Sequence, residues 1–149
     1  MEPRLNPYKL APGAYQALRQ MEDYVKQTGL EKPLLELVKT RASQINGCAF
    51  CLAMHTRDAR RAGESEERLY LLNAWHESPC YTPRERAALA WTEAVTLVSE
   101  THVPDHVFEE AKKHFTETEL VNLTMAVIAI NGWNRIAIAF RAQPQLGGN

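Results

Sequence analysis

Helix start and stop signals recur along this chain, and they constrain its fold more than any other feature. Between these signals, apolar residues return every three or four positions, as they do on one face of an α-helix. Strands would instead need alternating apolar and polar residues between turn dipeptides, and such runs are scarce in the sequence. The pattern therefore predicts an all-α fold.

The first half of the chain divides into a leader, residues 1–12, and four helices. The leader is marked by prolines, and the first helix carries apolar residues at helical spacing from Tyr15 to Val25. Glycines that end helices and prolines or polar residues that begin them supply the other boundaries. In order, these are Gly29 after the first helix, Pro33 and Asn46-Gly47 around the second, Cys48 and Gly63 around the third, and Ser65 before the fourth.

Two capping boxes organise the second half. Thr82 with Glu85 predicts the start of a helix that continues at the right period to Val98, and Pro104-Asp105 opens a short helix. Thr116 with Glu119 precedes the most apolar segment, Leu120 to Phe140, which we expect to be interrupted at Asn131-Gly132. This segment is apolar over much of its circumference, so it should be central in the fold or shared with another subunit.

Size and charge limit the classes of function. With 149 residues and 45% hydrophobic residues, the chain fits a single domain spanning 1–149. A net charge of −1 provides no basic field for binding nucleic acid or anionic lipid. The N-terminus lacks the apolar segment of a signal peptide, and the longest uncharged stretch, Leu120 to Asn134, is shorter than the ~20 residues that span a bilayer. We therefore expect a soluble, cytoplasmic protein with no nucleic-acid or membrane partner.

The cysteines point to chemistry. Three cysteines cannot all pair within one chain, and so few do not make a disulfide scaffold. Cys48 and Cys51 form a Cys-x-x-Cys motif, which in a reducing compartment indicates redox or metal chemistry. Cys80 has no partner at a useful spacing, so we interpret it as a small core residue.

The cysteine pair shares one helix face with a histidine. Cys51 lies three residues after Cys48 and four before His55, and residues at these spacings are neighbours on a helix surface. If the turn at Asn46-Gly47 folds the preceding helix back, Glu36 can approach the same face. The sequence therefore predicts a cluster of two thiols, one imidazole and one carboxylate.

This set of side chains suits the reduction of a peroxide. A thiol reacts as its thiolate, and both a helix start and a neighbouring imidazole favour the thiolate. A carboxylate can orient that imidazole and relay its proton. A second cysteine one turn away can then resolve the oxidised sulfur as a disulfide before it reaches the sulfinic acid.

The spacing Glu-x11-Cys-x2-Cys-x3-His resembles the alkylhydroperoxidase D core of the carboxymuconolactone decarboxylase superfamily. Ser-Gln-Ile-Asn-Gly before the first cysteine and Arg-Asp-Ala-Arg-Arg-Ala-Gly after the histidine carry the same resemblance, which is specific over Leu34 to Gly63. Some members have a histidine where this chain has Phe50. The resemblance implies a helical homo-oligomer, a trimer or a hexamer.

The resemblance also implies roles for Glu36, Cys48, Cys51 and His55 as the catalytic residues of a cofactor-free peroxidase. Its substrates would be hydrogen peroxide or organic hydroperoxides, and its reductant a lipoyl-bearing or thioredoxin-like protein or dithiol. Cys51 would attack the peroxide and Cys48 would resolve it. The helix dipole alone favours Cys48 as the more acidic thiol, but His55 lies one turn from Cys51, so we follow the resemblance.

Other functions compete with this hypothesis. The thiols could serve a non-enzymatic redox sensor or a thiol–disulfide exchange partner of another protein. A zinc site would need four ligands, which the spacing does not supply, and a thioredoxin fold needs a βαβ context. Decarboxylation belongs to a branch of the superfamily without the cysteine pair. We interpret the tryptophans as core or subunit-contact residues: Trp75, Trp91 and Trp133.

Overall fold

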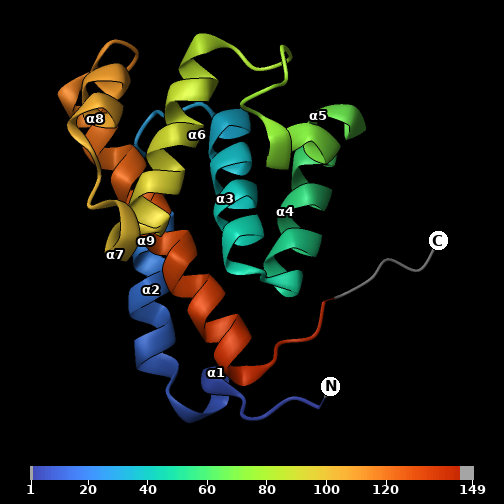
Figure 1. The fold of residues 1–149 in the computed structure, drawn as a ribbon. Coiled ribbons are helices and arrows are strands. Elements are labelled where there is room, and N and C mark those ends of the chain that lie inside the picture. Colours follow the sequence, from blue (N-terminus) through green and yellow to red (C-terminus); the bar gives the residue numbers. More distant parts are fainter. Residues whose placement is uncertain (1, 145–149) are drawn as a thin grey trace.

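A computed structural model describes residues 2–144 and confirms the all-α prediction, with no strand among those residues (Figure 1). A short 3₁₀ turn, Leu72–Ala74, follows the fifth helix. In chain order the helices are α1 (Pro7–Leu10), α2 (Pro12–Lys26), α3 (Lys32–Asn46), α4 (Ala49–Arg61), α5 (Glu66–Leu71), α6 (Pro83–Thr96), α7 (Val98–Thr101), α8 (Asp105–Lys112) and α9 (Glu117–Phe140).

Helix α3 lies at the centre of the fold and packs against α4, α6 and α9. Figure 1 shows α3 and α4 running antiparallel as a hairpin, with α6 on the other side of α3. The largest apolar cluster joins α2, α3, α6, α8 and α9, and a second lies between α3, α4, α5 and α6. A third, small cluster packs both cysteines of the motif against Ala42, Ile130 and Ala137.

The predicted interruption of the last helix is wrong, because α9 runs unbroken from Glu117 to Phe140. Gly132 does not end the helix; it faces α2, where an added Cβ would lie 3.2 Å from a methyl carbon of Leu18. Asn131 is buried, and its side-chain amide donates to the carbonyl of Val127 one turn earlier in the same helix. Close packing and buried hydrogen bonding therefore explain why Asn131-Gly132 is helical here, although this dipeptide in isolation favours a turn.

Buried amides connect α9 to the end of α3. Asn134 is fully buried, and its side chain donates to Ser43 Oγ at 3.0 Å. The side chain of Asn46 donates to the amide oxygens of Asn131 and Asn134 at 3.0 and 2.8 Å. Because an unpaired buried polar group costs free energy, these bonds restrict where the last turn of α3 can lie against α9.

Both predicted capping boxes are present, at Thr82 and Thr116. The helix that follows Thr82 is shorter than expected, because Leu97 leaves the helical conformation between α6 and α7. There the Thr101 hydroxyl donates to the carbonyl of Ala94. If the helix continued, a backbone amide one turn later would donate to this carbonyl instead. Helix α2 ends at Lys26, before the expected stop at Gly29.

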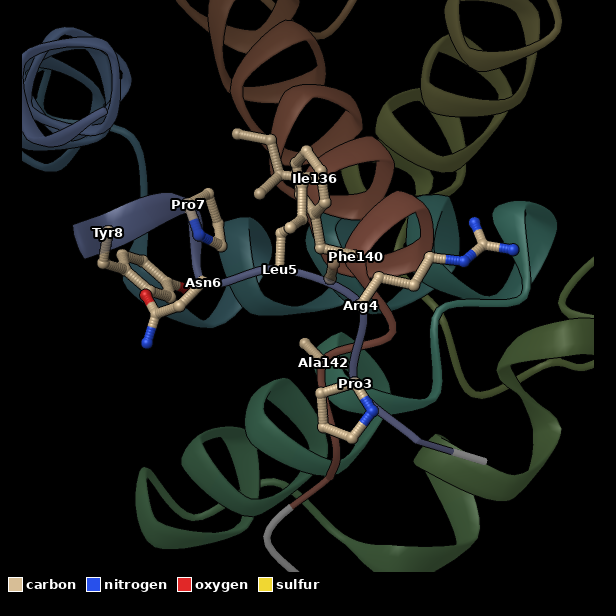
Figure 2. Close-up of a pocket in the computed structure, with 10 residues that line it drawn as sticks. Pro3, Arg4, Leu5, Asn6, Pro7, Tyr8, Ile136, Phe140 and Ala142 are labelled. Carbon is tan, nitrogen blue, oxygen red and sulfur yellow. The ribbon is translucent and has the colours of Figure 1, made fainter. Parts of the chain in front are cut away.

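The leader forms part of the fold. Pro7 and Pro12 each begin a helix, so the leader contains α1 and the first residue of α2. The backbone amide and guanidinium of Arg4 donate to the carbonyls of Phe140 and Ala139, which are exposed at the end of α9. Figure 2 shows this segment crossing the end of α9. Residues of the segment and of α9 line a cavity of about 330 Å³.

Length and composition alone would allow one helix within residues 2–144, α9, to cross a membrane. The longest uncharged stretch ends before Arg135, whereas the helix continues to Phe140. One such helix is weak evidence, because the core helix of a soluble protein passes the same test. Residues of α9 contribute to the largest and the smallest apolar clusters, which accounts for its hydropathy within the fold.

We predict that Asn134→Ala lowers the free energy of unfolding by about 1–3 kcal/mol, because it deprives Ser43 and Asn46 of buried partners. Chemical denaturation measures this change. Thr118→Ala, at an exposed position of the same helix, is the control and should change stability by less than about 0.5 kcal/mol. Equal stability of the two variants would show that the amide bonds do not hold the hairpin against α9.

Candidate active site

The turn between α3 and α4 places the cysteines. Gly47 has a φ of 68°, a left-handed conformation in which a glycine is least strained. The amides of Gly47 and Cys48 donate to the carbonyls of Gln44 and Ser43, closing α3 and reversing the chain. Cys48 then occupies the N-cap of α4, and its sulfur accepts a hydrogen bond from the amide of Cys51 at 3.3 Å. The prediction that the motif begins a helix is confirmed.

Cys48 and Cys51 are joined by a disulfide, with their Cα atoms 5.4 Å apart. Both residues are 1% exposed. Cys80 is free and half-buried, and its sulfur lies 2.9 Å from the hydroxyl of Ser78. The three cysteines thus divide into an oxidised pair and one separate thiol.

The hairpin brings Glu36 of α3 to His55 of α4. The Nδ1 atom of His55 lies 2.9 Å from Oε2 of Glu36, and both side chains are largely shielded from solvent. An ionised carboxylate can only accept, so Nδ1 carries a hydrogen; in the neutral form of the ring, Nε2 is then the nitrogen that can accept a proton. The predicted approach of Glu36 to the helix face of the motif is therefore present.

Local charges keep Glu36 ionised. Burial raises the pKa of its carboxyl, but the hydrogen bond and the charge of His55 act in the opposite direction. The charges of Lys39 and Lys32 add to this effect, and the net pKa lies below its ordinary value of 4.5. At neutral pH, Glu36 is an anion beside the imidazole.

Lys39 is a buried cation that the sequence argument did not place in the site. It is 3% exposed, and its Nζ lies 2.5 Å from Oε1 of Glu22 on α2. Its position three residues after Glu36, on the same face of α3, is the signal that could have identified it.

Cys51, His55 and Glu36 line one cavity of about 290 Å³ between α2, α4 and α9. Trp133 also lines this cavity, whereas Trp75 and Trp91 are buried in the core as predicted. Cys48 lines a different cavity, of about 310 Å³, between the start of α4 and the end of α9. The two cysteines of the disulfide therefore line two different cavities.

Among residues 2–144, no group of three or more His, Cys, Asp or Glu side chains is arranged to hold a metal ion. The cavity that Cys51 lines instead brings together a cysteine, an imidazole and a carboxylate, which are the side chains of a nucleophile, a base and an orienting group. This combination can activate a thiol by removing its proton.

The carboxymuconolactone decarboxylase family matches residues 12–94, more than half of the chain. The chain belongs to this family. The matched segment contains the α3–α4 hairpin and all four predicted site residues. The resemblance to the alkylhydroperoxidase D branch is thereby supported at the level of the superfamily.

Relatives of the chain within the family cover nearly its full length. An uncharacterised protein of Bacillus subtilis, YdfG, is 44% identical over 93% of this chain and 95% of its own. The crystal structure of a protein of unknown function from Agrobacterium tumefaciens is 46% identical and has a TM-score of 0.95, covering 98% of this chain and all of that one. That protein has itself been proposed to be an antioxidant defence protein, AhpD.

A more distant structure shows that the fold is shared beyond these relatives. The alkylhydroperoxidase AhpD core of an uncharacterised peroxidase-related protein from Ralstonia eutropha is 22% identical and has a TM-score of 0.81. It covers 93% of this chain, which spans 74% of that protein. At this identity, the likeness concerns the fold alone.

The lowered pKa of Glu36 predicts how stability depends on pH. A carboxyl whose pKa is lower in the folded protein stabilises the fold above its unfolded value, near 4.5, and loses that effect as the pH falls through the lowered value. Glu36→Gln should therefore lower the free energy of unfolding by about 1–3 kcal/mol at neutral pH, and its difference from wild type should shrink in acid.

Chemical denaturation at about pH 7 and about pH 3 measures this difference. Glu67→Gln, which removes an exposed carboxylate, is the matched control and should change stability little at either pH. A difference between wild type and Glu36→Gln that stays constant or grows on acidification would contradict the ion-pair assignment.

Proposed function

We propose that this protein is a thiol-dependent peroxidase that reduces hydrogen peroxide or organic hydroperoxides and acts without a cofactor. One observation carries the proposal: Cys51, His55 and Glu36 open onto the same cavity, and Cys51 is bonded to a second cysteine that can resolve it. The names of two related structures, an antioxidant defence protein and a peroxidase-related protein, are consistent with it.

The first step oxidises Cys51. In the reduced protein, Nε2 of His55 takes the thiol proton, while Glu36 holds the ring and stabilises its positive charge. The thiolate attacks the distal peroxide oxygen, so that an S–O bond forms as the O–O bond breaks. The leaving alkoxide takes the proton from His55 and departs as the alcohol, or as water from hydrogen peroxide. Cys51 becomes a sulfenic acid.

The second step forms the disulfide. The Cys48 sulfur attacks the Cys51 sulfur, and the sulfenic hydroxyl leaves as water with the proton of the Cys48 thiol. This step prevents further oxidation of Cys51 to the sulfinic acid. The Cys48–Cys51 bond in the structure is the bond that this step would form, which supports the proposal.

The separate cavities support the assignment of Cys51 as the attacking thiol. The dipole of α4 favours the Cys48 thiolate, because Cys48 is the N-cap. Cys48, however, does not share its cavity with His55 and Glu36, whereas Cys51 does. A base that takes the thiol proton and returns it to the leaving alcohol must share a space with the peroxide, and this requirement favours Cys51.

An external dithiol completes the cycle. Its thiolate attacks one sulfur of the disulfide, and its second thiol displaces the mixed disulfide, which leaves both cysteines reduced and the dithiol oxidised. Cys48 lines the second cavity, so we assign it as the cysteine that such a reductant attacks without entering the peroxide cavity. A lipoyl-bearing or thioredoxin-like protein in the cytoplasm fits this chemistry.

Other activities remain competing hypotheses. A decarboxylase would not need a resolving cysteine, and the oxidised pair beside a histidine–carboxylate couple favours thiol redox chemistry. A redox sensor would use the same four residues but would undergo one slow oxidation without turnover. Repeated peroxide consumption distinguishes an enzyme from a sensor.

We predict that wild-type protein, supplied with a small dithiol, consumes peroxide continuously and that Cys51→Ser abolishes this activity. Cys48→Ser should retain the first oxidation but form no intramolecular disulfide, so that without dithiol the reaction stops at the Cys51 sulfenic acid after one turnover. His55→Gln should slow the oxidation of the Cys51 thiol by about 10²-fold or more, because the proton has no acceptor. Cys80→Ser is the control and should match wild type.

Stopped-flow measurement of peroxide loss and thiol titration provide these rates. Wild-type rates in both Cys51→Ser and His55→Gln would refute the mechanism. One slow oxidation of wild type without turnover would favour the sensor.

The homo-oligomer implied by the family resemblance is also a proposal. Val121 and Ile128, seven residues apart on one face of α9, are 62% and 45% exposed, and a partner subunit would cover them. Light scattering should therefore give a mass several times that of one chain for wild type, and Ile128→Glu should lower it. A monomeric wild type would remove the proposal.

A further inference from the structure

The cavity beside Cys51 has an aromatic wall built from three parts of the chain. Tyr8 of α1 packs edge-on against Tyr15 of α2, with ring centroids 4.2 Å apart, and Tyr15 packs against Trp133 of α9 at 5.0 Å. Figure 2 shows that Tyr8 belongs to the N-terminal segment that crosses the end of α9. Hydrogen peroxide has no apolar surface, so this wall favours a substrate with an organic body.

Most charged groups that line this cavity already have an ion-pair or hydrogen-bond partner. The pairs are Glu22 with Lys39 at 2.5 Å, Glu36 with His55 at 2.9 Å, Lys26 with Asp23 at 3.7 Å, and Asp58 with Arg57 at 3.7 Å and with Arg61 at 3.9 Å. Burial raises the pKa of Tyr8, so the phenol next to Tyr15 stays neutral. Apart from the Glu36 carboxylate, which is hydrogen-bonded to His55, the pairs and the rings therefore leave little net charge on the wall.

Arg19 is the exception. It lies four residues after Tyr15, on the same face of α2, and it lines the cavity from an exposed position. Within residues 2–144, no hydrogen bond or ion pair connects it to another side chain. A guanidinium holds its charge at all working pH values and matches a carboxylate with two parallel hydrogen bonds.

We propose that this cavity binds a hydroperoxide with a compact apolar body, such as a single ring, and a carboxylate that pairs with Arg19. The proposal rests on the peroxidase function, and it names the substrate class of that site. The aromatic wall holds the body, and the peroxide group faces Cys51 and His55. The volume of about 290 Å³ lies near the lower end of the range for small-molecule pockets, which favours one ring over a long acyl chain.

The carboxylate does not take part in the reaction. As with an uncharged hydroperoxide, the distal peroxide oxygen is transferred to the Cys51 sulfur, and the product is the corresponding hydroxy acid. Arg19 therefore acts as a specificity-determining residue that raises the occupancy of the cavity and orients the substrate. Its loss should affect binding, while the reaction with hydrogen peroxide stays unchanged.

Binding can be tested without any peroxide chemistry. The oxidised protein is titrated with 4-isopropylbenzoate and with its neutral counterpart, 4-isopropylbenzamide, and the fluorescence of Trp133 or the heat of binding reports occupancy. We expect the carboxylate to bind about tenfold or more tightly than the amide, a difference of roughly 1.4 kcal/mol. Arg19→Gln should remove the preference, and Arg19→Lys should restore part of it.

Lys112→Gln, which removes one positive charge on α8 far from the cavity, is the matched control and should retain the full preference. High salt should weaken the preference of wild type, because Arg19 is exposed. Equal binding of the two compounds by wild type, or an unchanged preference in Arg19→Gln, would overturn the proposal.

The kinetic arm separates this proposal from the peroxidase function. Reduced protein is mixed with hydrogen peroxide, cumene hydroperoxide or the 4-carboxy derivative of cumene hydroperoxide, and loss of the Cys51 thiol is followed. We expect the carboxylated peroxide to react about tenfold faster than cumene hydroperoxide at low concentration in wild type, but not in Arg19→Gln. Hydrogen peroxide should react equally with both proteins.

These measurements distinguish failure of the proposed role of Arg19 from failure of the peroxidase function. Reduction of all three peroxides without a preference for the carboxylate would overturn the role of Arg19 and leave the peroxidase function intact. Failure to reduce any peroxide would overturn the peroxidase function, and with it the hydroperoxide proposed here, even if 4-isopropylbenzoate binds.

Discussion

The reversal of the chain at Gly47 is the constraint on which the site depends. Its left-handed conformation ends α3 and starts α4 within two residues, so the two helices run side by side in opposite directions. Glu36 and His55 lie nineteen residues apart in sequence, yet they meet at 2.9 Å because of this turn. The same turn makes Cys48 an N-cap and places both sulfurs at the start of α4. One backbone conformation thus brings together the four side chains to which we assign the roles of nucleophile, base, orienting carboxylate and resolving thiol.

The rest of the fold holds this hairpin in place and encloses it. Asn134 and Asn131 of α9 bind the side chain of Asn46, the last residue of α3, so the end of the hairpin is attached to the most apolar helix. Helices α2 and α9 then supply the aromatic wall of the cavity next to Cys51. In the proposed function, the hairpin thus supplies the reacting groups, and the surrounding helices line the cavity through which a substrate would reach them.

Much of this arrangement could be predicted from the sequence, because its determinants are local. Capping boxes, a glycine turn and residues three or four apart on one helix are governed by short-range geometry. They identified the helices among residues 2–144 other than α1 and α7, together with the Cys48–Cys51–His55 face. The errors arose where distant contacts decide the outcome. The continuity of α9 at Gly132 depends on Leu18, more than a hundred residues away, and the ion pair of Lys39 depends on Glu22 in another helix. The sequence around Arg19 carries no signal of a binding role, because residues from distant parts of the chain form the cavity that it lines.

The central claim is that Cys51 and Cys48 act together on a peroxide. The most direct test is to add one equivalent of hydrogen peroxide to the fully reduced protein and to map the products by mass spectrometry. The account predicts rapid loss of two hydrogens per chain, a peptide in which Cys48 is linked to Cys51, and an unmodified Cys80. Oxidation at Cys80, disulfides between chains, or a Cys51 that advances to the sulfinic acid without linking to Cys48 would contradict it.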